Sequence, residues 1–263
     1  MSAERRRRSA GLLAAGALGV ALVLAASAAL AAVGGAIVVA RPPVPPPPRP
    51  DPFLQQRRSM VTHQIRQRGI DKPAVLEAMG MVPRHFFVPP SEQARAYEDR
   101  PLPFGSAGRT IYQPYVVALM TSLLDLNPGK TVLEVGTGSG YHAAVLSRIA
   151  RKVYSIEIAA PVAAEAERRL SALGYRNVYI RVGDGYQGWP EEGPFDAILL
   201  SAAPPKIPKP LLDQLRVGGK MVVAEGGFVQ DLLVITKTAE GLEKRTVIPV
   251  RLSPMTGRVR DGG

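Results

Sequence analysis

The stretch 131–148, TVLEVGTGSGYHAAVLSR, constrains the fold more than any other part of the chain. A β-branched and apolar run meets three alternating glycines, Gly136, Gly138 and Gly140, and a helix-like segment then begins near Tyr141. Glycine adopts positive φ and leaves no Cβ in the way, so a ligand can lie against the backbone. The N-terminus of the following helix offers unpaired N–H groups. This order predicts a strand, a tight turn and a helix, which bind nucleotides at the carboxyl ends of strands in doubly wound sheets.

The spacing of the glycines narrows the choice of ligand. A dinucleotide fingerprint, GxGxxG, requires glycine at position 141, where this chain has Tyr141, so a nicotinamide cofactor is less favoured. A hydrolase nucleophile elbow is also disfavoured, because Thr137 and Tyr141 stand two residues to either side of Ser139 where that motif needs glycines. From this stretch alone, a glycine-rich turn that binds no nucleotide remains an alternative. The residues downstream distinguish the two interpretations.

Strand-like and helix-like segments alternate after the glycine turn. A helix is expected over 160–173, halted by Gly174, and the two β-like runs at 232–238 and 246–251 are expected to form an antiparallel hairpin. The other expected strands are 152–156, 178–182, 195–200 and 220–224. This alternation predicts an α/β fold, a Rossmann-like, doubly wound and mostly parallel sheet with a C-terminal antiparallel hairpin.

Two acidic residues follow the second and third strands of this expected sheet. Right-handed crossovers place Glu157 and Asp184 on the same edge as the glycine turn. Glu157 is then positioned to accept hydrogen bonds from ribose hydroxyls, and Asp184, flanked by Gly183 and Gly185, can present its carboxylate near an adenine amino group. Taken singly, each is more simply interpreted as a solvated carboxylate. The three features in this order favour a nucleotide-type cofactor.

The chain divides into three parts on composition. Residues 1–40 combine four consecutive arginines, Arg5 to Arg8, with an uncharged run of 31 residues at 10–40, longer than the roughly 20 that span a bilayer. A cleaved secretory signal and a membrane anchor are both consistent with this pattern. The proline-rich segment 41–52 is expected to be a semi-rigid linker. The positive-inside rule places the domain beyond the membrane, whereas a later translation start, for instance at Met60, removes the segment.

Residues 53–263 form the expected folded domain, with a helical N-terminal cap at 53–110 and a Rossmann-like core at 111–263. The cap is expected to contain a helix from Phe53 that stops at Gly69, a short helix at 72–79, and an irregular apolar segment at 82–90. A helix at 114–126 then leads into the first core strand, with Pro114 in its first turn.

Charge and residue usage exclude several functions. The formal net charge is +11, but the first 60 residues carry +6 of it, and no basic groove with interleaved aromatics follows, so nucleic acid is not an expected partner. The chain has no cysteine, which excludes disulfides and cysteine nucleophiles. Its three histidines, His63, His85 and His142, lack a ligand spacing, so no metal is expected.

From about 60 to 257, the chain resembles the protein-L-isoaspartate O-methyltransferases. The motifs that carry the resemblance are MVTHQIRQRGI, MVPRHFFVP, RPLPFG, TIYQPYVVALMTSLL, VLEVGTGSGY, GDGYQGW, PFDAILLSAAPPKIPKPLLDQLRVGG and PMTG, in this order. The resemblance implies a Rossmann-like sheet with a modified C-terminal strand order. It also implies methyl transfer from S-adenosylmethionine to the α-carboxyl of isoaspartyl residues in damaged proteins. The ester then cyclises to a succinimide that can reopen to normal aspartate.

The resemblance also assigns site residues. On the cofactor side these are Glu134, Gly136, Thr137, Gly138, Gly140, Glu157, Asp184 and Gly185. On the substrate side, in the loop 105–115 and the segment 254–257, they are Thr110, Tyr112 and Gln113 as catalytic residues, and Ile111, Pro114, Met255, Thr256 and Gly257 as substrate-binding residues. The substrate carboxylate is already ionised at neutral pH, so we expect placement and exclusion of water to provide catalysis without a strong base.

The substrate side departs from the family at Tyr112, where the family carries serine. The ring of tyrosine reaches about four ångströms further than a hydroxymethyl group. Its phenol can donate a similar hydrogen bond to the substrate carboxyl, or it can serve packing alone. Leu252-Ser253 and Arg258 also stand where the family usually has an aromatic-valine pair and often has glutamate.

Three functional hypotheses follow from this mixture of matching and altered motifs. The first is isoaspartyl repair, the second is a related methyltransferase with another carboxylate substrate, and the third is a non-catalytic S-adenosylmethionine-binding adaptor. For the first, the partners are isoaspartyl-containing proteins and peptides, and a membrane if 10–40 is retained. The protein is expected to be a monomer. The expected location is the cytoplasm, with an inner-membrane anchored or exported form as the alternative.

Overall fold

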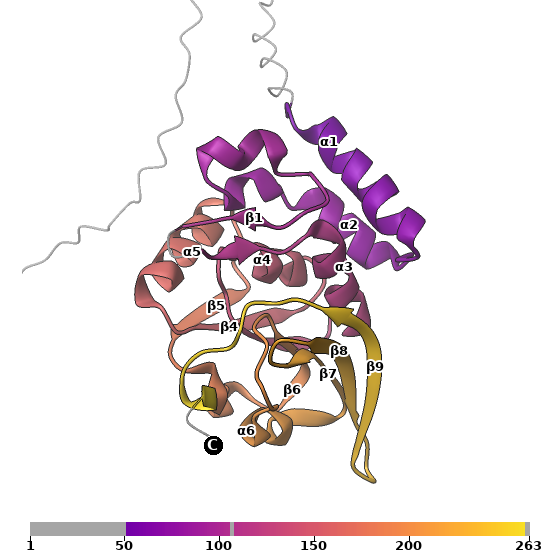
Figure 1. The fold of residues 1–263 in the computed structure, drawn as a ribbon, viewed down its shortest axis with the longest axis vertical. Coiled ribbons are helices and arrows are strands. Elements are labelled where there is room, and N and C mark those ends of the chain that lie inside the picture. Colours follow the sequence, from indigo (N-terminus) through magenta and orange to yellow (C-terminus); the bar gives the residue numbers. More distant parts are fainter. Residues whose placement is uncertain (1–50, 106–107, 261–263) are drawn as a thin grey trace, which may run out of the picture. The chain divides into compact units, whose positions relative to one another are not determined.

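The computed structural model describes residues 51–105 and 108–260, and a seven-stranded sheet forms its centre (Figure 1). The strand order is β5-β4-β3-β6-β7-β8-β9. Their bounds are β3 Thr131–Val135, β4 Lys152–Glu157, β5 Val178–Val182, β6 Phe195–Leu200, β7 Leu215–Gly226, β8 Gln230–Lys237 and β9 Leu242–Val250. The first five strands of this order pair in parallel, and β8 and β9 are antiparallel. The predicted Rossmann-like sheet and its C-terminal hairpin are confirmed.

Strand β3 lies at the centre because both of its faces are apolar. All five of its residues are buried, as is typical of a parallel strand covered on both sides. Successive side chains point to opposite faces. Val132 therefore joins an apolar cluster that includes helices α3 and α4, whereas Leu133 and Val135 join the cluster that includes Leu211 of α6. The fully buried Glu134 shares the face of Val132.

The helices are α1 Leu54–Ser59, α2 Pro73–Met81, α3 Pro114–Leu123, α4 Tyr141–Ser147, α5 Ala160–Ala172 and α6 Lys209–Asp213. Most agree with the sequence patterns, but α3 ends three residues before the expected 126. Asp125 takes a positive φ of 56°, which a helix cannot contain. Its carboxylate forms ion pairs with Lys72 at 2.6 Å and Lys220 at 3.4 Å. Asp125, with its positive φ, thus lies just beyond the end of the helix, where it pairs with two distant lysines.

The cap packs on the helix that follows the glycine turn. After α1 comes a π turn, Met60–Ile65, and then a 3-10 turn, Arg66–Arg68, that ends at Gly69 with φ 89°. The segment expected to be irregular contains a further 3-10 turn, Arg84–Phe87. Within that turn, the fully buried Arg84 donates to Ala96 O at 2.8 Å, and its guanidinium lies 4.9 Å from the ring centroid of Tyr141. The cap thereby contacts the first residue of α4.

Two short strands close the cap. β1, Leu102–Pro103, pairs antiparallel with β2, Thr110–Ile111.

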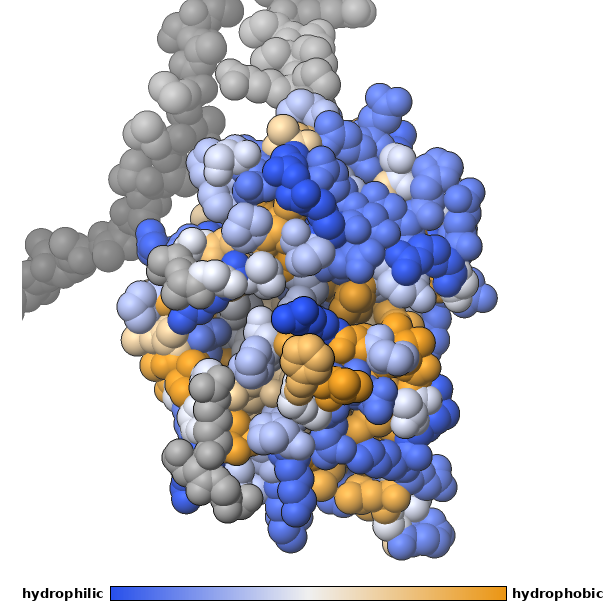
Figure 2. All heavy atoms as spheres, viewed as in Figure 1, coloured by the Kyte–Doolittle hydropathy of each residue, from blue (hydrophilic) through white to orange (hydrophobic). Residues whose placement is uncertain are grey.

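The long strands at the sheet edge exceed their expected lengths. β7 begins at Leu215, five residues before the expected start, because its register with β6 shifts between Phe195 and Ala197 and thereby accommodates Gly218-Gly219. In the view of Figure 2, side chains over α1 are mostly hydrophilic, and apolar side chains become more frequent below it.

Residues 1–50 lie outside the described part of the chain, and with them the expected signal or anchor segment 1–40 and most of the linker 41–52. Within the described residues, no helix is long and apolar enough to cross a membrane. Arg57, which is buried, donates to Gly80 O at 2.7 Å and to the Tyr97 hydroxyl at 3.1 Å. Residues just before Met60 are therefore packed into the domain, and a product beginning at Met60 would lack these contacts.

Candidate active site

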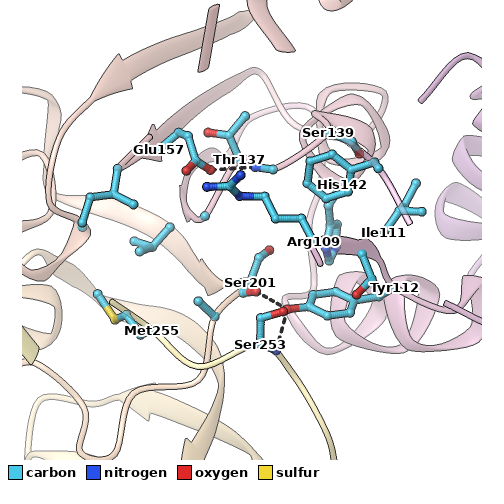
Figure 3. Close-up of a pocket in the computed structure, with 18 of the residues that line it drawn as sticks. Arg109, Ile111, Tyr112, Thr137, Ser139, His142, Glu157, Ser201, Ser253 and Met255 are labelled. Atoms are coloured by element: carbon cyan, nitrogen blue, oxygen red, sulfur yellow. Dashed lines mark hydrogen bonds between the residues drawn. The ribbon is translucent and has the colours of Figure 1, made fainter. Parts of the chain in front are cut away.

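A cavity of about 430 Å³ opens at the carboxyl ends of β3, β4 and β6 (Figure 3). The strand order reverses here, because β4 lies on one side of β3 and β6 on the other. Ligands of doubly wound sheets usually bind at such a reversal. Its volume suits a small organic ligand. The predicted site residues that line it are Thr110, Ile111, Tyr112, Gly136, Thr137, Gly138, Glu157, Gly185, Met255 and Thr256.

The glycine turn has the conformation that its sequence requires. Gly136, Gly138 and Gly140 take φ values of 99°, 55° and 85°, which disfavour any side chain. A Cβ on Gly138 would lie 3.2 Å from the ring of Phe104, another residue that lines the cavity. Gly140 does not line the cavity; a Cβ there would lie 3.2 Å from Leu170 of α5. Gly140 therefore allows α4 to pack on α5.

Glu157 holds this turn from the end of β4. Its Oε2 accepts a hydrogen bond from the amide of Gly138 at 3.0 Å, and its Oε1 accepts one from the amide of Ala159 at 3.0 Å. The side chain is 7% exposed and lines the cavity. Each carboxylate oxygen can accept a second hydrogen bond, so Glu157 retains the capacity to bind ligand hydroxyls.

Glu134 lies below the cavity wall and does not line it. Its Oε2 accepts a hydrogen bond from Ser155 Oγ at 2.6 Å, and Ser155 Oγ lies 2.6 Å from Thr137 Oγ1. Ser201 Oγ, which does line the cavity, lies 3.4 Å from the other oxygen. Complete burial raises the pKa of Glu134 to about 8, so the carboxyl is protonated at neutral pH. Glu134 therefore supports two residues that do line the cavity, Thr137 through Ser155 and Ser201 directly.

Asp184, expected beside an adenine amino group, does not line the cavity, and its carboxylate accepts hydrogen bonds from two backbone amides. Its Oδ1 accepts from the amide of Tyr186 at 2.9 Å, and its Oδ2 accepts from the amide of Arg258 at 2.8 Å. Its neighbour Gly185 lines the cavity instead, and a Cβ on Gly185 would overlap Val135. Gly257 has φ 91° and packs directly on the Asp184 carboxylate. Asp184 therefore ties the C-terminal segment to the end of β5.

Tyr112, which stands at the family's serine position, lines the cavity and bonds two backbone groups. Its hydroxyl donates to Ser201 O at 2.6 Å and accepts from the amide of Ser253 at 3.1 Å, as the dashed lines of Figure 3 show. Burial raises the pKa of this phenol. The longer side chain reaches across to two backbone groups that a serine hydroxyl could not reach. Tyr112 thus joins the end of β2, the end of β6 and the C-terminal segment.

His142, the second residue of α4, lines the cavity, whereas its spacing in the sequence bore only on a metal site. Its Nε2 lies 3.0 Å from Thr121 Oγ1, and that hydroxyl donates its proton to Val117 O at 2.8 Å. Nε2 must therefore carry the imidazole proton in this contact. Burial lowers the pKa of His142 to about 3, so the ring is neutral. Its position in the first turn of the helix that follows the glycine turn could have indicated that it lines the cavity.

The other differences concern the loop and the start of α3. Gln113 and Pro114 do not line the cavity; they are the N-cap and first residue of α3. Arg109, which was not singled out within the loop 105–115, lines the cavity, and Figure 3 shows its side chain extending toward Glu157. Among the described residues, no group of three or more histidine, aspartate or glutamate side chains is arranged to hold a metal ion.

The fold and the cavity define a class I methyltransferase: a doubly wound sheet with a glycine turn after β3 and an acidic residue at the end of β4. The model of the protein-L-isoaspartate(D-aspartate) O-methyltransferase family matches residues 55–260. The chain belongs to this family.

Named relatives agree with this membership. A protein-L-isoaspartate O-methyltransferase from a Synechococcus species is 55% identical over 213 residues, covering 78% of this chain and 87% of the relative. One from Gloeobacter violaceus is 51% identical over 199 residues, covering 75% of this chain and 97% of the relative. A solved protein-L-isoaspartate O-methyltransferase aligns with a TM-score of 0.70 at 28% identity, over 77% of this chain and 67% of that one. A Plasmodium falciparum structure described as the same enzyme, with S-adenosyl-L-homocysteine, aligns with a TM-score of 0.65 at 26% identity, over 76% and 98%.

Glu134 should make stability depend on pH. Glutamate has an ordinary pKa of 4.5, and the folded value is about 8, so unfolding releases a proton between these values. The free energy of unfolding should therefore fall as pH rises through this window, by at most about 1.4 kcal/mol per pH unit. Glu134→Gln removes the pH dependence that this carboxyl contributes. In urea unfolding, the variant should therefore gain stability relative to the parent as the pH rises from 5 to 8. The exposed Glu167→Gln is the control. If the free energies of unfolding of Glu134→Gln and the parent differ by the same amount at pH 5 and pH 8, the pKa of Glu134 is not raised in the folded state.

Tyr112→Phe should loosen the C-terminal segment. It removes a hydroxyl that bonds two backbone groups, which should lower the free energy of unfolding by about 1–2 kcal/mol. The amide of Ser253 should then exchange its hydrogen roughly fivefold faster or more. Hydrogen exchange read by NMR measures this directly, with Tyr179→Phe, 43% exposed on β5, as the control. An unchanged exchange rate at Ser253 would show that the hydroxyl does not hold the segment.

Proposed function

We propose that this protein transfers a methyl group from S-adenosylmethionine to the α-carboxyl of isoaspartyl residues in damaged proteins. One observation carries the proposal: a cavity whose glycine turn is held by Glu157 occurs in a chain about half identical to named protein-L-isoaspartate O-methyltransferases, over most of both lengths. The Plasmodium falciparum relative was solved with S-adenosyl-L-homocysteine, the product left after methyl donation.

The residues of the cavity fit S-adenosylmethionine. Glu157 can accept hydrogen bonds from the two ribose hydroxyls, and the apolar side chains of Phe104 and Ile158 line the same cavity. Gly136 and Gly138, without side chains, let a ligand approach the backbone closely. The carboxylate of Glu157 also complements the positive charge of the ligand, whereas Glu134 beneath it is held neutral and adds no second charge.

The chemistry requires placement more than proton transfer. When bound, S-adenosylmethionine supplies an electrophilic methyl group on a sulfonium. The substrate carboxylate is ionised at neutral pH, so its oxygen can form the new bond while sulfur keeps the electron pair of the bond that breaks. No proton moves in this exchange, and the neutral imidazole of His142 is not required as a base. The chain instead aligns the two reactants and excludes water, through the walls at 108–112 and 253–256.

Location and domain division are part of this proposal. We place the activity in the cytoplasm, where S-adenosylmethionine is made, with an inner-membrane anchored or exported form as the alternative if 1–40 is retained. We also propose that 53–110 acts as a cap on a catalytic core at 111–263, and that the protein is a monomer. The contact of Arg84 with Tyr141 supports the cap, because it joins the two parts beside the glycine turn.

The experiment for the function is a radiolabelled methyl-transfer assay with the full chain. Isoaspartyl peptides should become labelled as base-labile esters, and matched aspartyl peptides should not. The two peptides differ only in which carboxyl group is free, so the comparison isolates recognition of the isoaspartyl linkage. Equal labelling of both would indicate another carboxyl substrate, and binding of S-adenosylhomocysteine without labelling would indicate a non-catalytic adaptor.

Glu157→Gln should weaken the affinity for S-adenosylhomocysteine by roughly tenfold, because a hydrogen bond to a charged group contributes about 1.5–3 kcal/mol. The substitution preserves volume while removing the charge and one acceptor. Calorimetric titration measures the affinity, and the exposed Glu167→Gln should bind as the parent does. Parent-like affinity in a folded Glu157→Gln would exclude Glu157 from the ligand site.

A further inference from the structure

The turn between β7 and β8 exposes two adjacent apolar side chains. Strand β7 ends at Gly226 and β8 begins at Gln230, and Phe228 and Val229 lie between them. Phe228 is 95% exposed and Val229 is 72% exposed, the two highest values among the large apolar side chains of the described residues. Exposed apolar residues are usually scattered singly, whereas Phe228 and Val229 are adjacent.

Both ends of this turn are hydrogen-bonded to residues that adjoin the cavity lining. The amide of Gly226 donates to Pro204 O at 3.1 Å, two residues after Ala202, which lines the cavity. Gln230 accepts from the amide of Leu252 at 2.7 Å and donates to its carbonyl at 3.2 Å, one residue before Ser253, which also lines it. Because β7 runs parallel to β6, this turn lies at the carboxyl edge of the sheet, the same edge as the cavity, and Pro204 and Leu252 connect it to the cavity lining.

The wall and the turn form one connected unit. Ala203 donates to Ser253 O at 2.8 Å and accepts from the amide of Met255 at 2.7 Å, which fixes the segment 253–256 along the end of β6. Gly226 has φ 135°, and a Cβ there would overlap the carbonyl of Val229, so the shape of the turn requires this glycine. Phe228 and Val229 are thus held at a defined place relative to the cavity.

We propose that Phe228 and Val229 contact the polypeptide of the substrate and favour apolar side chains next to the isoaspartyl residue. This inference rests on the proposed function. The acceptor carboxyl must enter the cavity while the rest of its polypeptide stays outside, so the flanking residues have to cross the rim. Two side chains offer an area that suits a few residues of an extended chain and is far below the roughly 1,200 Å² of a stable protein interface.

The test compares two isoaspartyl peptides that differ only in their flanking residues, leucine in one and serine in the other. The full-length parent should have the lower KM for the leucine peptide, because the apolar contact removes surface from water. The double variant F228S/V229S should show a roughly tenfold higher KM for the leucine peptide, equivalent to about 1.4 kcal/mol, with kcat retained. Its KM for the serine peptide should stay within twofold.

Val217→Ser is the matched control, because Val217 is 59% exposed near the amino end of the same strand, away from the cavity edge. It should leave both KM values unchanged, and all variants should bind S-adenosylhomocysteine as the parent does. If the parent methylates both peptides with equal KM, this inference is overturned and the proposed function stands. The same holds if F228S/V229S keeps the parent's KM for both peptides and differs from the parent only in self-association. A parent that methylates no isoaspartyl peptide overturns the proposed function itself.

Discussion

The site depends on how the end of β4 holds the glycine turn that follows β3. The carbonyl of Ile156 accepts from the amides of Gly136 at 2.8 Å and Thr137 at 3.2 Å, and the carboxylate of Glu157 accepts from the amide of Gly138 at 3.0 Å. Two adjacent residues thus satisfy three donors of the turn. Because Val135 pairs with Ile156 in the parallel register, a slip of one residue between these strands would dismantle the cavity.

A second set of contacts holds the C-terminal segment as the opposite wall of the cavity. Tyr112 bonds Ser253, Asp184 bonds Arg258, and Gln230 bonds Leu252, in each case through a backbone amide. Tyr112 lines the cavity, whereas Asp184 and Gln230 do not, and all three side chains fix the backbone of this wall. This arrangement gives a rigid wall, which suits a reaction whose rate depends on alignment rather than on proton transfer.

Much of the fold could be predicted because its signals are local. Local signals include the β-branched residues of β3 and β5, the largely apolar run of β6, the glycines at 69 and 174, and the proline at the start of α3. The predictions were less accurate where distant residues decide. Helix α3 ends before Asp125, which takes a positive φ and pairs with Lys72 and Lys220, and β7 begins early because it follows β6 through an irregular register.

The sequence by itself determined the glycine turn, the acidic residue after β4 and the family, because spacing along the chain sets all three. Only the tertiary structure decided what the polar side chains bind. The partners of Tyr112 lie 89 and 141 positions away, and the C-terminal partner of Asp184 lies 74 positions away. Burial, which keeps Glu134 protonated and His142 neutral, is likewise a property of the packed fold. The direction and charge of a side chain depend on neighbours that no local pattern records.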